Sequence, residues 1–357
     1  MKKIEIFLRK ILLNILLSFR YSSKPEEVDY QNANSKILFI RLNRIGDALV
    51  VTPLIHEIRQ TVKSKIFLLA DRKNNFVFEN NKDVDQVIIF EKGIRGIITV
   101  LKFIKDNKIN TVVDLHDDVS TTVTFLIAFS KASNKFGLEK ENKKIYTKTV
   151  PKLNPKNYHV VERILEICKL FSNNCKKEDV NIQYSVQESS EVDVAKFLQN
   201  NKLNGAALVG VNISAGSNAR FWGVENYHKL FAFLSTFDLK CVLLTAPDDI
   251  ELAGQISEGK IKVYFSKNYN EYAAMISRLN LLFTPDTAAV HLASAFKVPV
   301  FGIYVKYNTN DMIWSPYRSK FDCIITEAPN LGNVTFDEVK TKFEPFLRDI
   351  LLENVKQ

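Results

Sequence analysis

The sequence predicts an α/β protein built from two Rossmann-like halves with a cleft between them. Short apolar runs alternate with helical segments along the chain, which is the pattern of parallel βαβ units. The alternation pauses near the middle of the chain and then starts again. The 357 residues are long for one hydrophobic core and sufficient for two.

Composition and charge narrow the class of protein. The chain is 46% hydrophobic and 25% charged, which is ordinary for a folded globular protein. Its net charge of +9 favours phosphate-rich partners or an anionic membrane surface. Nucleic acid is not expected as a partner, because the sequence shows no helix-turn-helix spacing, zinc-finger spacing or RNA-recognition pattern. The scattered cysteines argue against a zinc site or a disulfide framework and for a reducing, cytosolic compartment: Cys168, Cys175, Cys241 and Cys323.

Residues 1–35 differ from the rest of the chain. Lys3, Lys10, Asn14 and Ser18 follow helical spacing and leave a wide apolar face opposite. Charges interrupt the apolar run, which is too short to span a bilayer, and no signal-peptide cleavage site follows it. We expect a basic amphipathic helix over residues 1–21 that lies on the membrane surface, or alternatively docks on the protein itself. A polar, proline-containing linker completes the segment.

The first half, residues 36–185, is predicted to be a Rossmann-like domain. Strands are expected at 36–42, 65–70, 86–90 and 111–115, with a helix over Asp47–Val62. Residues 186–205 are charged and are expected to be a helix or the interdomain connection. In the second Rossmann-like half, residues 206–334, strands are expected at 206–213, 240–245, 262–265, 280–284 and 298–304. Residues 335–357 have helical periodicity.

The first candidate site is the turn in IRLNRIGDALVVTP, residues 40–53. A strand ends at Leu42, and Arg44, Gly46 and Asp47 form a tight connection into a helix. Glycine permits a close approach of the backbone to a ligand, and Asp47 would face whatever enters the cleft. An aspartate at a helix start is also a common N-cap, so this turn alone is weak evidence.

Two more strand ends in the second half carry polar loops. In NISAGSNARFW, residues 212–222, a loop of small residues leads to Arg220 and could cradle an anion, or could be a solvated surface loop. In TAPDDIE, residues 245–251, the acidic side chains could accept ribose hydroxyls, or could merely favour the first helical turn.

The most informative stretch is LLFTPDTAAVHLASAFKVPVFGIY, residues 281–304. It reads as strand, polar turn, helix over Ala288–Phe296, and strand. Asp286, Thr287 and His291 fall at or just after the turn, where ligands bind in open parallel sheets and helix N-termini attract anions. Taken alone, either polar residue of the turn could only cap the helix, and the histidine could be a satisfied core residue.

Together these segments resemble glycosyltransferase family 9, the heptosyltransferase family of lipopolysaccharide assembly, from about Lys36 to Tyr317. The family's opening signature looks like RLNRIGDALVVTP, its central signature like NISAGSNARFWG and its closing signature like PDTAAVHLASAFKVP. The intermediate VVDLHDDVSTT is also similar to a family strand with a polar turn. The signatures follow one another in the family's order.

The resemblance implies a GT-B fold and an inverting transfer that needs no metal and no cofactor beyond the nucleotide sugar. The second half would bind the nucleotide sugar and the first half the acceptor. Carried over at matching positions, Asp47 is the general base. The donor-binding residues expected are Ser214, Arg220, Asp249, Glu251, Asp286, Thr287, Ala288 and His291. The acceptor-binding residues expected are Arg44, Gly46, His116 and Asp117.

Two positions depart from the family pattern. Ala288 stands where the family usually has glycine in DTG, and Gly223 replaces the usual proline after Trp222. Neither removes a catalytic group, but both leave the identity of the sugar open.

The expected function is therefore transfer of a heptose or another hexose-like sugar from a nucleotide diphosphate sugar, such as ADP-heptose, to a lipopolysaccharide core or related lipid-linked glycan. The enzyme would be cytoplasmic and peripheral on the inner face of the membrane, held there through residues 1–21. The alternatives are a nucleotide-sugar epimerase or hydrolase of the same fold, and a non-catalytic nucleotide-sugar-binding protein of the cell envelope.

Overall fold

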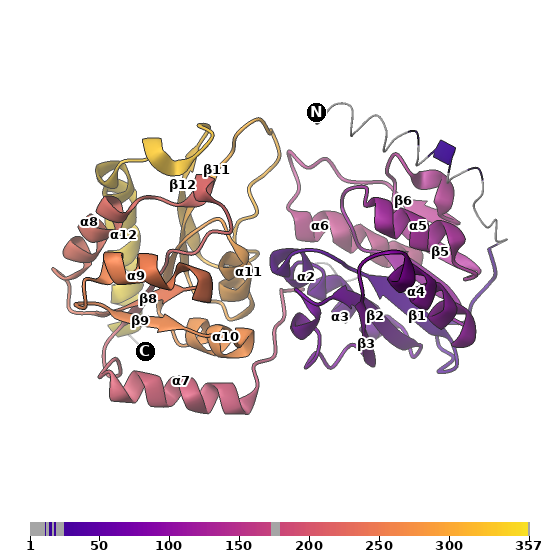
Figure 1. Ribbon diagram of the computed structural model, residues 1–357, viewed down its shortest axis with the longest axis horizontal. Helices are drawn as coiled ribbons and strands as arrows, with labels where there is room; N and C mark the ends of the chain where they lie inside the picture. Colours follow the sequence, from indigo (N-terminus) through magenta and orange to yellow (C-terminus); the bar gives the residue numbers. More distant parts are fainter. Residues whose placement is uncertain (1–10, 12–13, 16–17, 19–24, 173–178, 356–357) are drawn as a thin grey trace. The chain divides into compact units, whose positions relative to one another are not determined.

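The computed structural model describes residues 25–172 and 179–355, together with Ile11, Asn14, Ile15 and Ser18. The chain forms two compact units, Met1–Val180 and Asn181–Gln357. Each unit contains one six-stranded parallel sheet, so the predicted α/β class with two Rossmann-like domains is confirmed (Figure 1).

The sheet of the first unit has the strand order β3-β2-β1-β4-β5-β6. Its strands are β1 (Lys36–Ile40), β2 (Lys65–Asp71), β3 (Gln86–Phe90), β4 (Thr111–Asp114), β5 (Asn134–Leu138) and β6 (Lys148–Val150). The order reverses between β1 and β4, which are neighbours in the sheet. In open α/β sheets this switch point is where ligands bind, outside the carboxyl ends of the strands.

Helices cover both faces of this sheet. They are α2 (Ile45–Leu49), α3 (Thr52–Thr61), α4 (Ile94–Asp106), α5 (Thr121–Phe129) and α6 (Val160–Leu165), with 3-10 turns η1 (Asn75–Val77), η2 (Lys143–Ile145) and η3 (Glu166–Leu170). Residues of α4 and α5 form one core with Leu38 and Phe67 of the sheet. Helix α3 packs against α6 and η3.

Local sequence explains two differences from the predicted elements. The single helix expected over Asp47–Val62 is wrong, since α2 ends at Leu49 and α3 starts at Thr52. Pro53 lies in the first turn of α3, where its missing N–H costs no helical hydrogen bond. Strands β5 and β6 were not predicted: β5 begins with two polar residues and β6 has only 3 residues.

The sheet of the second unit has the order β12-β11-β10-β7-β8-β9. Its strands are β7 (Leu208–Asn212), β8 (Lys240–Thr245), β9 (Lys262–Phe265), β10 (Leu281–Pro285), β11 (Val300–Val305) and β12 (Phe321–Thr326). Strand β12, at the sheet edge, was not predicted. The order reverses between the neighbours β7 and β10, so the switch point lies between the loops that follow these two strands.

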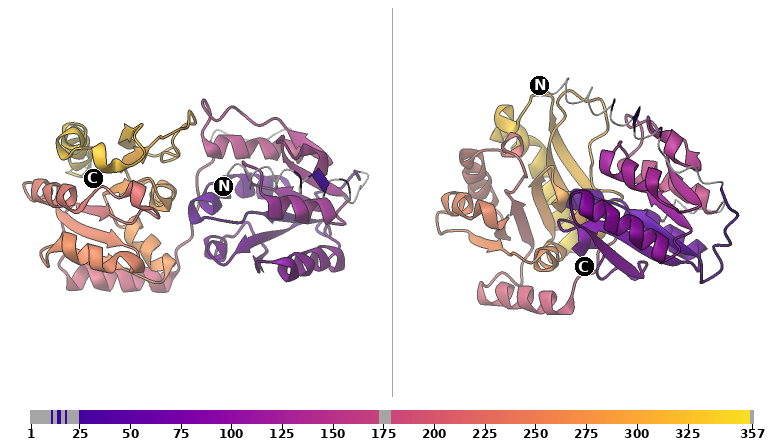
Figure 2. Two further views of the ribbon diagram at one scale, coloured as in Figure 1. Left: turned by 45° about the horizontal axis from the view of Figure 1, so that its top comes forward. Right: turned by 45° about the vertical axis from the view of Figure 1, so that its right-hand side comes forward.

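This sheet is also a layer between helices, as both views of Figure 2 show. The helices are α7 (Glu188–Asn200), α8 (Val224–Leu234), α9 (Ile250–Ser257), α10 (Tyr269–Ser277), α11 (Ala288–Ala295) and α12 (Phe336–Val355), with 3-10 turns η4 (Asn218–Arg220), η5 (Pro247–Asp249) and η6 (Leu331–Asn333). Helices α8, α9 and α12 share one core, in which Phe343 packs 4.9 Å from Phe301 between ring centroids. Helix α7 occupies most of the segment 186–205 and packs against α10 of the same unit.

The structure can be compared with the predictions for the N-terminal segment, for membrane-spanning helices and for the cysteines. The amphipathic helix predicted over residues 1–21 lies mostly outside the described residues. No helix among the described residues is long and apolar enough to cross a membrane. The sequence argued against a disulfide framework, but Cys168 is disulfide-bonded; Cys241 and Cys323 are free, and Cys175 lies outside the described residues.

Candidate active site

The turn between β1 and α2 places Asp47 at the carboxyl end of the first sheet. The chain leaves β1 through Asn43, whose φ of 96° is in the left-handed region that asparagine tolerates better than most residues. Asp47 then lies in the first turn of α2, with its side chain 19% exposed. Its Oδ2 accepts a hydrogen bond of 3.3 Å from the backbone N–H of Arg44. Arg44 is therefore the N-cap, and Asp47 is the third residue of the helix, whose carboxylate bonds back to the N-cap N–H and remains reachable from solvent.

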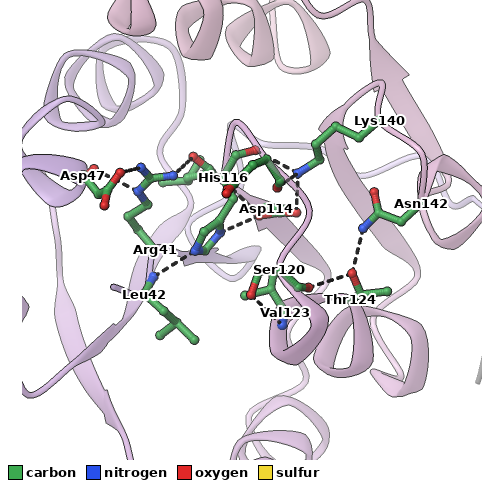
Figure 3. A network of polar contacts seen from close by, with 12 residues as sticks. Arg41, Leu42, Asp47, Asp114, His116, Ser120, Val123, Thr124, Lys140 and Asn142 are labelled. Carbon is green, nitrogen blue, oxygen red and sulfur yellow. Dashed lines mark hydrogen bonds and ion pairs between the residues drawn. The ribbon is translucent and has the colours of Figure 1, made fainter. Parts of the chain in front are cut away.

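A buried arginine holds the Asp47 side chain in one orientation by hydrogen bonds. Arg41, 2% exposed, directly follows β1. Its Nη2 donates to Asp47 Oδ1 at 2.5 Å and its Nε to the Asp47 carbonyl at 2.9 Å (Figure 3). Its Nη1 donates to the carbonyl of Leu115 at 2.8 Å, which ties the loop after β1 to the loop after β4. A planar guanidinium can hold three acceptors in fixed directions, so Asp47 is oriented from both its side chain and its backbone.

A second buried network lies beside the first, centred on Asp114 at the end of β4 (Figure 3). Lys140 Nζ and the Tyr146 hydroxyl both donate to Asp114 Oδ2, at 2.8 and 2.6 Å. Burial alone would raise the pKa of Asp114, but the charge of Lys140 and the hydrogen bonds from His116 and Lys140 hold it well below its ordinary value. The pKa of Tyr146 is raised well above its ordinary value by burial and by this carboxylate. The network therefore keeps a buried, ionised and fully bonded aspartate at the switch point.

His116 belongs to this network. Its side chain is 0% exposed. Its Nδ1 lies 2.8 Å from Asp114 Oδ1, and its Nε2 accepts the backbone N–H of Leu42 at 3.3 Å. Since Nε2 is an acceptor, a proton is assigned to Nδ1, which donates to Asp114. Both ring nitrogens are used within the protein, which makes His116 a brace between β4 and the end of β1.

Asp117, the next acceptor candidate, lies between two cations. Arg163 Nη2 is 3.1 Å from its Oδ2, and Lys152 Nζ is 3.5 Å from its Oδ1. Lys152 also donates to the Asp117 backbone carbonyl at 2.7 Å. The loop after β4 thus presents a carboxylate with two positive charges beside it.

In the second unit, Asn212 joins the two loops of the switch point. It ends β7 and is 2% exposed. Its Nδ2 lies 2.9 Å from Thr284 Oγ1, 3.0 Å from the Ser214 carbonyl and 3.5 Å from Thr287 Oγ1. Its Oδ1 accepts the Tyr272 hydroxyl at 3.2 Å. One amide therefore sets the relative position of the Ser214 loop and the turn at Thr287.

Ser214 connects the loop after β7 to the end of β8. Its Oγ accepts the backbone N–H of Ala246 at 2.7 Å and lies 3.3 Å from Thr245 Oγ1. Beyond that turn, Asp249 is half-buried and Glu251 exposed at the start of α9. The loops after β7, β8 and β10 therefore form one connected rim at the carboxyl edge of this sheet.

Arg220 and Asp286 meet on this rim. Arg220 Nη2 lies 3.0 Å from Asp286 Oδ2, and its Nη1 donates to the Asp286 carbonyl at 3.2 Å. Their side chains are 33% and 22% exposed, so water and ligands reach the pair. Breaking a partly exposed ion pair costs little free energy, so either partner can turn to a polar ligand.

The turn after β10 leads directly into α11. The Thr287 hydroxyl accepts the backbone N–H of Ala289 at 3.2 Å, so Thr287 is the N-cap that one alternative predicted. Ala288 starts the helix without a positive φ, so this backbone path does not require the family's glycine. His291 is 3% exposed, and its ring centroid lies 5.9 Å from that of Trp314. The N-terminal end of the α11 dipole, which favours anions, thus faces the rim.

Gly223 is the second departure from the family pattern, and its backbone explains it. It is the N-cap of α8 with φ 99° and ψ 141°. Proline is locked near φ −65°, so this entry into α8 requires glycine. The preceding Trp222 is buried, and its Nε1 donates to the Val334 carbonyl at 2.8 Å, which anchors the loop.

The described residues contain no group of three or more histidine, cysteine, aspartate or glutamate side chains that could hold a metal ion. The residues that prediction missed are Arg41, Asp114 and Asn212. Each is a polar residue at the end of a buried apolar run, which is the signal that could have found them. Lys140 and Tyr146 lie in a segment where no strand was predicted, so nothing placed them beside Asp114.

Comparison with known proteins gives consistent results. Residues 97–341 match the model of "Glycosyltransferase family 9 (heptosyltransferase)". The chain is 24% identical over 342 residues to the "Putative lipopolysaccharide heptosyltransferase 4" of Escherichia coli K12, covering 93% of each protein. Among solved structures, a glycosyltransferase family 9 protein from Veillonella parvula has a TM-score of 0.79 at 21% identity, covering 92% of this chain and all of that one.

The E. coli heptosyltransferase WaaC, solved with ADP, has a TM-score of 0.66 at 17% identity, covering 88% of this chain and 99% of that one. At these identities the structural matches show the fold, which is that of the GT-B heptosyltransferases. The family match extends over more than half of the chain. The chain therefore belongs to glycosyltransferase family 9, and it is a glycosyltransferase of the heptosyltransferase kind.

Proposed function

We propose that the enzyme transfers a sugar, with inversion and without a metal ion, from a nucleotide diphosphate sugar to a lipopolysaccharide core or related lipid-linked glycan. The observation that carries this proposal is the Asp47 carboxylate. Arg41 holds one of its oxygens, and among the described residues the other accepts a hydrogen bond only from a backbone N–H, at 3.3 Å. ADP-heptose is the first donor to test, because a family relative was solved with ADP.

In the proposed step, Asp47 Oδ2 takes the proton of an acceptor hydroxyl as that oxygen bonds to the anomeric carbon. The bond from the anomeric carbon to the diphosphate oxygen breaks at the same time, and the nucleoside diphosphate leaves with the bonding electron pair. Attack from the face opposite the leaving group inverts the anomeric centre. Arg41 keeps its own proton and holds the base in one orientation.

The second unit binds the donor in this proposal. Arg220 supplies a permanent positive charge for the diphosphate, and the N-terminus of α11 adds backbone dipoles. Asp286, freed from Arg220 when the diphosphate binds, accepts sugar hydroxyls, while Asp249 and Glu251 accept those of the ribose. Thr287 and His291 line the phosphate turn, and Ser214 and Ala288 shape it.

The first unit receives the acceptor. Arg44 and Gly46 lie on the same turn as Asp47 and contact the acceptor from there. Asp117, with its two neighbouring cations, binds polar groups of the acceptor glycan. His116 has no free ring nitrogen, so we assign it to positioning the turn after β1 rather than to direct contact.

A lipid-linked acceptor places the reaction at the inner face of the cytoplasmic membrane, to which residues 1–21 would bind. The basic, apolar composition of this segment supports the assignment.

The decisive experiment supplies the purified full-length chain with a panel of nucleotide sugars and a lipid glycan fraction, in EDTA. We expect acceptor-dependent release of a nucleoside diphosphate and a product whose anomeric configuration, read by NMR, is inverted relative to the donor. Release without acceptor favours a hydrolase, and a changed free sugar nucleotide favours an epimerase. Tight donor binding without turnover on any acceptor indicates a non-catalytic binding protein, and loss of transfer in EDTA contradicts metal independence.

A further inference from the structure

Helix α4 presents an unusual outer face. Ile94 and Ile98, one helical turn apart, are 63% and 59% exposed, among the most exposed large hydrophobic side chains of the described residues. The opposite face is ordinary, since Val100 and Ile104 are buried in the core of the first unit. A single exposed isoleucine needs no explanation, but two in line on one helix form a stripe.

Basic side chains flank this stripe. Arg95, Lys102 and Lys105 are exposed on the same helix, and Lys92 lies two residues before its start. The charged groups of Arg95, Lys102 and Lys105 form no ion pair or hydrogen bond with any residue that the structure describes. At 100° per residue, positions 94, 98, 102 and 105 fall within a sector of about 80°. Asp106 is the one exposed acidic residue of α4.

We propose that this face of α4 binds the surface of an anionic phospholipid bilayer, as a second membrane contact besides the N-terminal segment. The two isoleucines would insert at the boundary between headgroups and acyl chains, and the lysines and arginine would pair with lipid phosphates. Exposed isoleucines with basic side chains beside them match the apolar interior and the negative phosphates of an anionic lipid surface.

The position of α4 relates this surface to the candidate site. All strands of the first sheet are parallel. Helix α4 starts just after β3, and the turn that carries Asp47 follows β1. The N-terminus of α4 and Asp47 therefore lie at the same edge of the sheet. A bilayer bound along α4 would present lipid-linked molecules to that edge.

The test measures vesicle binding of the full-length chain without any sugar substrate, so its result does not depend on the proposed reaction. Vesicles of phosphatidylglycerol and phosphatidylcholine are compared with phosphatidylcholine alone by co-sedimentation. We expect Ile94→Ser with Ile98→Ser to weaken partitioning to anionic vesicles about tenfold. Lys102→Gln with Lys105→Gln should weaken it about thirtyfold, with the remaining binding falling further in salt.

Helix α7 offers a matched control. Val192 and Lys196 are an exposed apolar and basic pair one turn apart on it. Val192→Ser with Lys196→Gln should leave partitioning within twofold of wild type. If the α4 variants also stay within twofold of wild type, or if neutral vesicles bind as well as anionic ones, the proposal is overturned. Loss of a lipid-free dimer in the α4 variants would instead assign the face to a second copy of the chain.

A local probe separates α4 from the N-terminal segment. Ile98→Trp adds a tryptophan to the two of the native chain, one of which, Trp222, is buried. We expect its emission to shift to the blue on anionic vesicles and to be quenched by lipids that carry a shallow doxyl label. An unshifted emission while the chain is bound to vesicles would show that α4 does not touch the bilayer.

Discussion

The replacement Arg41→Lys tests how the proposed base is held. Lysine keeps the positive charge but cannot reach the Leu115 carbonyl, the Asp47 carbonyl and the Asp47 carboxylate together, as the guanidinium does. With two of these hydrogen bonds lost at about 1 kcal/mol each, the first unit should lose roughly 2 kcal/mol of unfolding free energy. Release of the carboxylate from its orientation should lower kcat about a hundredfold.

The donor-binding residues belong to the other unit, so the donor Kd should stay within about twofold of wild type. The assays are calorimetric titration of the nucleoside diphosphate, steady-state transfer and urea unfolding. Arg59→Lys is a matched control, because Arg59 also donates to two carbonyls, those of Asp83 and Ser64, and to the carboxylate of Asp85. It should cost similar stability and leave kcat unchanged. A kcat for Arg41→Lys within threefold of that of Arg59→Lys would refute the reasoning.

Three further predictions concern the two networks and the ion pair. Asp114→Asn leaves Lys140 buried beside a neutral group and should cost about 3 kcal/mol of unfolding free energy, measured in urea. Because Lys140 and His116 hold the pKa of Asp114 low in the folded state, the wild-type stability from this group is complete above about pH 4 and declines as pH falls below it. Between about pH 5 and pH 3 the wild type should therefore lose more unfolding free energy than Asp114→Asn. Parallel stability curves for the two proteins would count against an ionised Asp114. Asn212→Asp removes the donors to Thr284 and Ser214 and should weaken nucleoside diphosphate binding about tenfold by calorimetry, whereas an unchanged Kd would mean that the two loops hold their positions without the amide. Arg220→Gln should lower kcat/KM for the donor about a hundredfold, with the larger part in kcat, and a change in KM alone would show that the charge serves only ground-state binding.

Most of the fold could be predicted from the sequence because its central strands are continuous apolar runs bounded by polar turns. Strands β1, β2, β7 and β8 are buried in parallel sheets and read clearly. The strands that escaped prediction lie toward the sheet edges. β5 and β6 contain polar residues, and β12 is partly exposed. The local sequence alone does not predict which polar residues can be buried in a strand of the sheet.

The candidate site was predictable to the level of its strand ends, where Asp47, Arg220 and Asp286 lie. What could not be predicted is which polar groups satisfy one another. His116 was expected to contact the acceptor, yet both of its ring nitrogens are bonded inside the first unit. Its partner Lys140 comes from 24 residues further along the chain, at a position set only by the pairing of β4 with β5. Such long-range pairing is a property of topology rather than of local pattern.

The role of Asp47 is the central claim, and Asp47→Asn tests it most directly. The amide keeps the size of the carboxylate and can still accept from Arg41, but it cannot take a proton from an acceptor hydroxyl. Transfer and donor binding are measured side by side on this variant. The claim predicts that kcat falls at least about a thousandfold while the donor Kd stays within about twofold of wild type. Transfer retained within about tenfold of wild type would contradict it.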